Sequence, residues 1–244
     1  VKLYLQKANG PILNIVKGFT GSKYGLILDD LEHFYELDPK RFVAIAGANY
    51  PEQVMERKLT GYEVAANNPD LIDHICKLFS TGYVFTRPAV VSDDVRGVQL
   101  GGALKNIYAL GIGLLDGYYE KSLGGNTDNS LFHVSNRIFK EMKIIGSKLG
   151  GKPGTFEGLS GLTDLMMACF GQDSRDRQHG HDYIYGKANP DQKTAGLFGV
   201  RSLPNLLPLN PEEYPVASAV HAVLVQKRDY DSVLNEIMSK LKRF

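Results

Sequence analysis

The sequence predicts an α/β layer followed by an all-helical region, and three observations support this fold class. Short apolar runs alternate with helical patterns over the first 90 residues, which is typical of strands joined by crossover helices. No convincing strand follows Asp94, and apolar side chains then recur at helical spacing. We therefore expect a domain boundary near residue 92, with one domain at 1–92 and a second at 93–244.

The first region contains the expected strands. A proline opens the apolar run 11–16, which we interpret as a buried parallel strand that ends at Lys17. A proline followed by good helix formers predicts a helix over 51–58. The full set comprises strands at 11–16, 42–49, 63–68 and 83–87 and helices at 26–36, 51–58 and 69–79, after the end of a helix at 1–8.

The second region is expected to be helical throughout. Its longest regular pattern covers 126–149, where apolar side chains from Leu131 to Ile145 fall on one stripe. One or two short helices are expected over 155–169. The remaining expected helices lie at 94–117, 188–203, 211–225 and 229–244.

The charge of the chain is nearly balanced, with 28 basic and 27 acidic residues. This balance gives no electrostatic reason to expect a nucleic acid or an anionic membrane as a partner. Glycine or charge breaks the apolar runs before the roughly 20 residues that a membrane span needs. Cys76 and Cys169 form no metal spacing and no targeting segment is visible, so we expect a reducing, cytoplasmic location. Because the first residue is Val1, we expect the sequence to begin within a longer protein.

One lysine lies inside an apolar, glycine-rich helix. Lys105 is in the middle of 94–117, together with Gly101, Gly102, Gly111 and Gly113. Each interior glycine costs a helix roughly 1 kcal/mol relative to alanine, a cost that is usually accepted for close packing against a backbone or a ligand. A charged amine in such a run must find a partner or lose its proton, unless it extends from a helix end to solvent.

Two further candidate positions follow expected strands. Lys17 comes directly after the strand at 11–16, and Gly47 and Asn49 end the strand at 42–49. Open α/β sheets bind ligands beyond the carboxyl ends of their strands, where a glycine permits close approach and an amide both donates and accepts hydrogen bonds. Taken singly, Lys17 also fits a solvated loop lysine, and Gly47 with Asn49 fits an ordinary turn.

Charged residues in the second region provide the next candidates. Asp164 lies in an apolar setting, where a buried carboxylate requires a cationic partner. Ser174, Arg175 and Arg177 bring a hydroxyl and two guanidinium groups together, which suits a phosphate group. A solvated charged loop fits the same residues equally well.

Two weaker patterns have simpler interpretations. His179 and His181 lie in a polar segment without a nearby set of carboxylate and histidine ligands, so we expect them to be exposed and to bind no metal. Asn126 or Thr127 can cap the helix at 126–149, and the free amides there also suit an anion.

The ordered motifs GVQLGGALKN, DG…GGNT, TFEGLSGLTDL and SRDR together resemble the NAD(P)-dependent glycerol-3-phosphate dehydrogenase family. The resemblance runs from about residue 11 to the C-terminus, and the helix that contains Lys105 is its most specific part. It implies the C-terminal part of a Rossmann-like parallel-sheet domain, followed by a helical domain like that of 6-phosphogluconate dehydrogenases. It further implies an oxidoreductase that interconverts dihydroxyacetone phosphate and sn-glycerol 3-phosphate with NAD or NADP. Such an enzyme feeds glycerophospholipid and carbohydrate metabolism, binds a phosphorylated small molecule and is compatible with a homodimer.

The same resemblance implies roles for individual residues. Lys105 matches the general acid/base that serves the C2 oxygen, Lys17 a substrate-contacting lysine, and Asp164 the carboxylate that completes the catalytic site. Hydride delivery to a ketone leaves negative charge on its oxygen, which an ammonium group stabilises and protonates. The implied substrate contacts are Lys17, Gly47, Asn49, Lys105, Asn106, Asp164, Ser174, Arg175 and Asp176. The implied cofactor contacts are Lys17, Pro51, Arg175, Gly196 and Phe198. Thr127 matches a polar position near the site.

The sequence departs from the family's pattern at four points. The first half of the Rossmann domain, with its GxGxxG fingerprint, is absent, which predicts poor dinucleotide binding by this chain alone. Gln99 and Phe198 stand where Glu is usual, and Asp176 stands where Asn is usual. These changes keep two alternatives open: a non-catalytic descendant that binds a phosphorylated metabolite, and a related two-domain dehydrogenase for another hydroxy acid.

Overall fold

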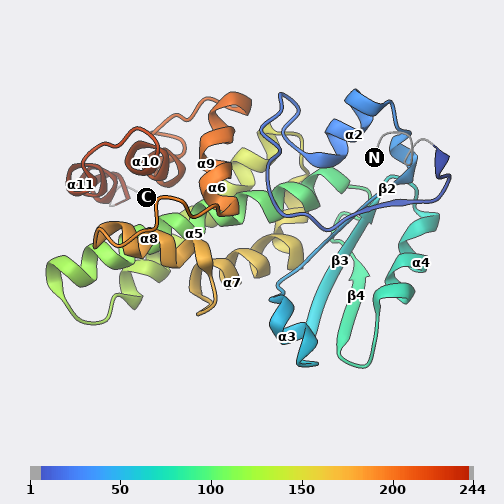
Figure 1. Cartoon of the computed structure of the whole chain (residues 1–244), viewed down its shortest axis with the longest axis horizontal. Helices are drawn as coiled ribbons and strands as arrows, with labels where there is room; N and C mark the ends of the chain where they lie inside the picture. The colour runs from blue at the N-terminus through green and yellow to red at the C-terminus, as the bar shows by residue number, and fades with distance from the viewer. Residues whose placement is uncertain (1–6, 242–244) are drawn as a thin grey trace.

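A computed structural model describes residues 7–241 of the chain. A small sheet lies at one end of the molecule and a bundle of helices at the other (Figure 1). The long helix α5 (Val95–Leu123) begins beside the sheet and runs through the bundle. The predicted class, an α/β layer followed by helices, is confirmed. The helix end expected at 1–8 lies largely outside the described residues.

The described sheet has the strand order β1 (Ile12–Asn14), β2 (Phe42–Ala46), β3 (Thr60–Ala66) and β4 (Val84–Pro88). β1 is parallel to β2 and β3 is parallel to β4, but β3 runs antiparallel to β2. This corrects the expectation of a purely parallel sheet. The connecting helix α3 (Pro51–Met55) rises roughly 8 Å, about half the roughly 16 Å length of β2, so it does not carry the chain back to the opposite end of the sheet.

Helices cover both faces of the sheet. Side chains alternate between faces along each strand, so Ala44 of β2 packs towards α2 (Ile27–Tyr35) and α5, whereas Val43 packs towards α4 (Asp70–Phe79). The 3₁₀ turn η1 (Pro39–Arg41) leads into β2. The predicted helices of this first region are thus present, although α3 is shorter than expected.

No strand is assigned after β4 within the described residues, as predicted. Two expectations about helices need correction. The helix expected from residue 188 begins later, because Thr194 accepts a hydrogen bond from Leu197 N and caps it there. The charged segment at Ser174 is not a loop but the start of a helix, which Ser174 caps. The helical elements are α6 (Asp128–Lys148), η2 (Pro153–Glu157), η3 (Leu159–Thr163), α7 (Asp164–Phe170), α8 (Arg175–Ile184), α9 (Ala195–Leu206), α10 (Pro215–Leu224) and α11 (Tyr230–Leu241).

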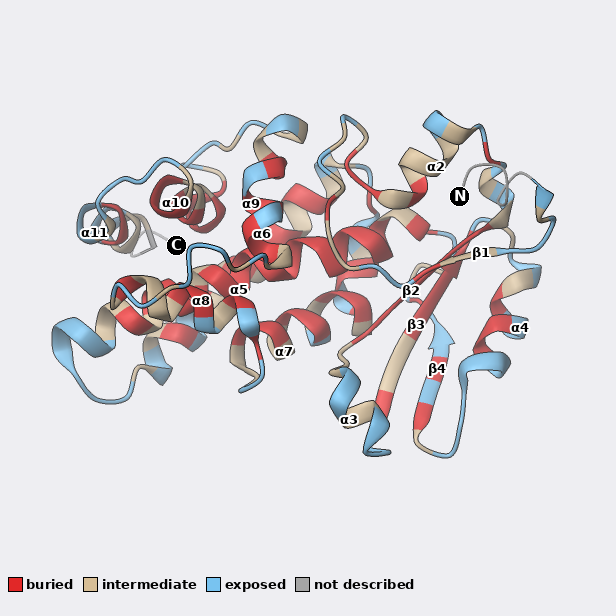
Figure 2. Cartoon of the chain, in the orientation of Figure 1, coloured by how far each residue is buried: buried red, intermediate tan, exposed pale blue. Residues whose placement is uncertain are grey.

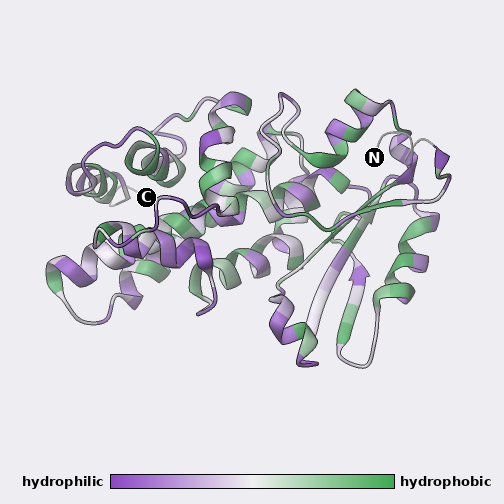
Figure 3. Cartoon of the chain, in the orientation of Figure 1, coloured by the Kyte–Doolittle hydropathy of each residue, from purple (hydrophilic) through white to green (hydrophobic). Residues whose placement is uncertain are grey.

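Helix α5 is the core around which the bundle packs, and it is buried over most of its length (Figure 2). Contrary to the expectation from its broken apolar runs, it is long and apolar enough to span a membrane. All of its most apolar stretch is nevertheless buried inside the protein, as expected of a core helix. Even the hydrophilic helix α8 packs against it (Figure 3).

The glycines of α5 allow other backbone segments to approach closely, as predicted. A Cβ atom on Gly101 would lie 2.4 Å from the carbonyl oxygen of Ser160, and one on Gly113 would lie 2.0 Å from that of Arg177. Alanine at either position would therefore force the neighbouring segment away from α5. The close packing of these segments on α5 offsets the lower helix propensity of glycine.

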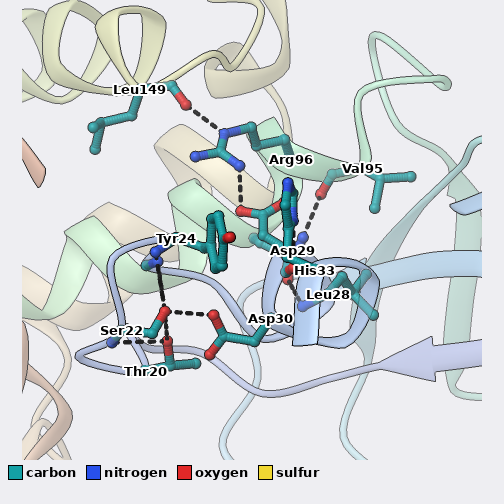
Figure 4. Close-up of polar contacts among 12 residues, drawn as sticks. Thr20, Ser22, Tyr24, Leu28, Asp29, Asp30, His33, Val95, Arg96 and Leu149 are labelled. Atoms are coloured by element: carbon teal, nitrogen blue, oxygen red, sulfur yellow. Dashed lines mark hydrogen bonds and ion pairs between the residues drawn. The ribbon is translucent and has the colours of Figure 1, made fainter. Parts of the chain in front are cut away.

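Polar contacts connect α2 to the helical region (Figure 4). Arg96, near the start of α5, forms an ion pair with Asp29 of α2 and donates a hydrogen bond to the carbonyl oxygen of Leu149 after α6. Phe19 and Leu26, in the segment between β1 and α2, belong to the hydrophobic core of the helical region. The segment that follows Lys17 is therefore anchored on the helical region.

We predict that Glu141 stabilises the helical region. Glu141 is fully buried in α6 and accepts hydrogen bonds from Val216 N (3.0 Å) and Ala217 N (3.1 Å) at the start of α10, while Arg137 lies 3.3 Å away. Glu141→Ala removes the acceptor of both amides and a charge partner of Arg137, so the free energy of unfolding should fall by about 3–5 kcal/mol. Urea unfolding monitored by circular dichroism measures this change.

The matched control is Glu157→Ala, which removes an exposed carboxylate paired with Lys143. Exposed ion pairs contribute about 0–1 kcal/mol, so this variant should unfold at nearly the wild-type urea concentration. Equal effects of the two substitutions would contradict the role assigned to Glu141.

Candidate active site

An open cleft of about 1110 Å³ lies where the sheet meets the helical region. Its walls come from the ends of β1 and β2, from α3, from the middle of α5, and from the starts of α8 and α9. Segments that are far apart in sequence therefore meet at one site. The residues predicted from the sequence that line it are Lys17, Asn49, Pro51, Lys105, Asn106, Ser174, Arg175 and Asp176.

Two lysines share one buried carboxylate at the wall of this cleft. Lys105 of α5 forms a hydrogen-bonded ion pair with Oδ1 of Asp164, and Lys17 Nζ lies 3.0 Å from Oδ2 of the same residue. The Asp164 side chain is fully buried, whereas the Lys105 and Lys17 side chains are 8% and 19% exposed. The predicted cationic partner of Asp164 is thus two ammonium groups, both of which reach the cleft.

The Lys17 ammonium is held from a second side by the loop after β2. Its Nζ donates to the carbonyl oxygen of Gly47 and to Oδ1 of Asn49, both at 2.6 Å. Its stem packs on α5, where a Cβ atom on Gly102 would lie 3.1 Å from Lys17 Cγ. Lys17 is therefore fixed by backbone, amide and carboxylate groups, and it is not a solvated loop lysine.

The environment of Lys17 lowers the pKa of its ammonium group. Burial, the largest effect, and the positive charge of Lys105 lower the pKa of Lys17, whereas Asp164 raises it, and the net result is a decrease from 10.5 to about 8. A group with such a pKa exchanges protons close to neutral pH. This property suits a site that handles a proton.

Gly47 serves the packing of the strands. A Cβ atom there would lie 2.1 Å from the carbonyl oxygen of Gly61 on the neighbouring strand β3. The proposed reason for this glycine, approach of a ligand to the backbone, is therefore not needed. Its carbonyl oxygen still contributes to the site through Lys17.

Only one of the two guanidinium groups in the SRDR segment lines the cleft. Arg175 is exposed there, and among the described residues no carboxylate forms an ion pair with it. Arg177 points elsewhere, to Asp116 at 2.8 Å and to the carbonyl oxygen of Phe170. The prediction that both arginines contact a phosphate group is therefore wrong, and only Ser174 and Arg175 of this segment remain as candidate phosphate contacts.

Asp176 holds the start of α9. Its Oδ1 accepts a hydrogen bond from Gly196 N at 3.0 Å, and burial raises the pKa of its carboxyl group although this bond, Thr194 and Arg175 oppose the increase. Gly196 in turn lies against α5, because a Cβ atom there would be 2.4 Å from the carbonyl oxygen of Asn106. The carboxyl group is thus engaged with the protein backbone at the edge of the cleft.

The other two departures from the family pattern lie outside the cleft lining. Gln99 is buried and accepts hydrogen bonds from Asn14 Nδ2 and Leu28 N, both at 3.2 Å, so it joins β1, α2 and α5. Phe198 is 47% exposed and covers Gly21, whose Cβ position lies 3.0 Å from its ring. Among the described residues, no hydrogen bond or ion pair joins either residue to the lysine pair, although Gln99 and Lys17 line the same small cavity.

Three polar residues have partners that the sequence did not indicate. Thr127 donates to Asp116 at 2.5 Å and lies outside the cleft lining, so its expected proximity to the site is wrong. His179 is buried, with Nδ1 2.9 Å from Gln192, and His181 pairs with Glu120, which corrects the expectation that both are simply exposed. No group of three or more potential metal ligands occurs among the described residues.

Tyr50 and Lys193 also line the cleft, and sequence reasoning missed them. The Tyr50 hydroxyl donates to the carbonyl oxygen of Met167, which ties α3 to α7 at 3.2 Å. A signal for Tyr50 was present, because the residue before Pro51 is restricted to extended backbone at the entry of a helix. Lys193 directly precedes Thr194, which caps α9, and no local pattern in the sequence indicated that it lies at the site.

The fold and the cleft together define a class of protein: an enzyme built from part of an α/β domain and a helical domain, with paired lysines and an arginine that line an open cleft. Residues 94–235 match the family model described as the C-terminus of NAD-dependent glycerol-3-phosphate dehydrogenase. The chain belongs to the glycerol-3-phosphate dehydrogenase family.

Curated relatives agree with this assignment. The chain is 30% identical to glycerol-3-phosphate dehydrogenase [NAD(P)+] of Lactobacillus johnsonii, over 94% of this chain and 67% of the relative. It is 36% identical to the protein of the same name from Thermus thermophilus, over 84% of this chain and 62% of that protein. The chain thus spans about two thirds of the length of these relatives.

Solved structures support the fold. The crystal structure of glycerol-3-phosphate dehydrogenase from Coxiella burnetii has a TM-score of 0.79 at 25% identity and covers 95% of this chain, which in turn covers 70% of that chain. The enzyme from Saccharomyces cerevisiae has a TM-score of 0.73 at 22% identity over 93% of this chain and 67% of that chain, a likeness of fold alone.

We predict that Asp164 sets the protonation of Lys17. Because the carboxylate raises the pKa of Lys17, Asp164→Asn should lower that pKa below its value of about 8. The measurement is a pH titration of the lysine side-chain signals by heteronuclear NMR, with the Lys17 signal identified by its loss in Lys17→Arg. Glu157→Gln is the matched control. An unchanged Lys17 titration in a folded Asp164→Asn variant would contradict the geometry described above.

Proposed function

We propose that this chain forms the catalytic and substrate-binding part of an enzyme that interconverts dihydroxyacetone phosphate and sn-glycerol 3-phosphate with NAD or NADP. The observation that carries the proposal is the pair of lysines on Asp164 at the wall of a cleft that Arg175 also lines. Two ammonium groups and one carboxylate leave a net positive charge of one facing the cleft. Such a site attracts an anion and stabilises a developing oxyanion.

Each of these residues has a distinct role in the proposal. When bound, a nicotinamide cofactor would supply the hydride that reduces the ketone carbon of the substrate. Lys105 stabilises the negative charge on the C2 oxygen and donates a proton to it, and Asp164 holds the ammonium in place. Lys17 and Asn49 orient the substrate from the strand side, and Arg175 with Ser174 and Asn106 binds its phosphate end.

The cleft suits a nicotinamide ring as well as a substrate. Ile15, Ile45 and Tyr62 form an apolar wall on its sheet side, next to Lys17. These side chains would hold the nicotinamide ring in the same cleft that Lys17 and Lys105 line. Pro51 and Arg175 line the same space, so we retain their predicted cofactor contacts, and those predicted for Gly196 and Phe198 require the cofactor to extend beyond the cleft lining.

The same proposal includes a division of the chain near residue 92, which the start of the family match at residue 94 supports. It also includes a phosphorylated substrate, a cytoplasmic location and a homodimeric state. A catalytic function is favoured over a non-catalytic descendant because Gln99 is hydrogen-bonded to Asn14 and Leu28 and Phe198 covers Gly21, so neither substitution removes a partner of Asp164 or of its lysines. Asp176 is engaged with Gly196 and leaves the cluster intact.

We predict that Lys105→Ala lowers turnover by a factor of about 10²–10⁴, because general acid catalysis contributes about that much. The assay follows oxidation of NADH and of NADPH with dihydroxyacetone phosphate. It uses the chain itself and the chain preceded by the N-terminal third of the Lactobacillus johnsonii relative, since this chain spans 67% of that relative. Lys143→Ala, which changes a lysine outside the cleft lining, is the control. Near-normal turnover by Lys105→Ala would exclude the proposed mechanism.

We predict that Arg175→Ala weakens binding of sn-glycerol 3-phosphate by about 1.5–3 kcal/mol, the contribution of a hydrogen bond to a charged group. Isothermal titration calorimetry on this chain measures the loss, and glycerol without phosphate should not bind detectably. Arg201→Ala, on the exposed side of α9, should bind like the wild type. Binding of glycerol 3-phosphate without any turnover in the extended chain would favour the non-catalytic alternative.

A further inference from the structure

A carboxylate is buried in the sheet beside the active-site cluster. Glu63 of β3 has no exposed surface. Its Oε2 accepts two hydrogen bonds from Ser160, one from the backbone N and one from the hydroxyl group, both at 3.1 Å. Its Oε1 pairs with Arg87 of β4 at 3.0 Å, and the Arg87 side chain is 45% exposed. The charge of Glu63 is therefore compensated, and one oxygen is committed to Ser160.

The segment that Glu63 contacts leads directly to Asp164. Ser160 lies in η3, a single π-helical turn, and Asp164 is the first residue of α7 after this turn. A π-helical turn changes the rotational phase of the following helix relative to an α-helical one, and such turns are frequent at functional sites. The direction of the Asp164 side chain therefore depends on where η3 begins.

β3 and η3 are closely packed against each other. A Cβ atom on Gly158 would lie 2.4 Å from both carboxylate oxygens of Glu63, and one on Gly61 would lie 3.0 Å from Leu159 Cδ1. On its other side, η3 packs on α5, since the Ser160 carbonyl oxygen faces Gly101. A shift of η3 away from β3 would therefore be a shift of Asp164 relative to both Lys17 and Lys105.

We propose that Glu63 is a positioning residue: by fixing Ser160 at the start of η3, it sets the position of the Asp164 carboxylate between the two lysines. The proposal rests on the proposed function in that Asp164 completes the reactive cluster. A charged acceptor is suited to this task because hydrogen bonds to an ionised group are roughly twice as strong as neutral ones. Without it the buried Ser160 N would lose its acceptor.

The experiment measures the position of Asp164 through Lys17. The charged groups that face Lys17 are Asp164, which raises its pKa, and Lys105, which lowers it. Glu63→Gln keeps the shape of the side chain but removes its charge and its ion pair with Arg87. If η3 shifts and carries Asp164 away, the pKa of Lys17 should decrease in this variant, by at least half of the decrease that Asp164→Asn produces in the same NMR titration.

Two further variants separate positioning from general stabilisation. Glu157→Gln changes an exposed carboxylate just before η3 and should leave the Lys17 titration unchanged. Ser160→Ala removes one of the two hydrogen bonds to Glu63 and should lower the pKa of Lys17 in the same direction, by a smaller amount. If Glu63→Gln does not fold, Ser160→Ala alone tests the positioning role of Glu63, because Ser160→Ala keeps the ion pair between Glu63 and Arg87.

A folded Glu63→Gln protein in which Lys17 titrates as in the wild type would overturn the proposal, whatever its stability. So would an unchanged titration in Ser160→Ala if that is the variant that folds. The titration uses neither substrate nor cofactor, so this failure is distinct from failure of the proposed function, which the Lys105→Ala assay tests. In the extended chain, Glu63→Gln should lower kcat more than it raises KM.

Discussion

The structure depends most on one interaction, the buried Asp164 carboxylate between two ammonium groups. A fully buried charge is unfavourable unless it is paired and hydrogen-bonded, so Asp164 requires Lys105 and Lys17 as much as they require it. Because two positive charges share one negative charge, the cluster as a whole retains a positive charge. That charge faces the cleft, where an anionic substrate can compensate it.

The unusual composition of α5 follows from the need to bring three segments to this carboxylate. Gly101 lets the backbone at Ser160 approach α5, and Gly102 makes room for the stem of Lys17. Larger side chains at these positions would separate the parts that Lys105 must contact. Gly101, Gly102 and Lys105 thus serve a single purpose, and the loss of helix propensity is the consequence.

Local signals in the sequence pointed to the residues at the centre of the site, and the family resemblance supplied their expected roles. A charge in an apolar run identified Lys105 and Asp164, and position after a strand identified Lys17 and Asn49. By contrast, the antiparallel β3 and the helical state of α8 depend on tertiary packing, which overrides local propensity. The partners of Arg177 and His179 lie on elements whose proximity the sequence does not specify. Glu63 did have a local signal, a carboxylate between apolar residues of a strand, but its partner Ser160 is far away in the sequence.

The departure at Asp176 leaves the structural task of this position unchanged. Asparagine and aspartate have nearly the same shape, and each offers an oxygen that accepts hydrogen bonds. Oδ1 of Asp176 accepts from Gly196 N, a hydrogen bond that the oxygen of an amide could also accept. Burial raises the pKa of the Asp176 carboxyl group, so its negative charge is less favourable here than in water. The position therefore retains its structural task at the start of α9 with either residue. Its negative charge is directed at the backbone of α9, and Arg175 next to it remains available to a phosphate group.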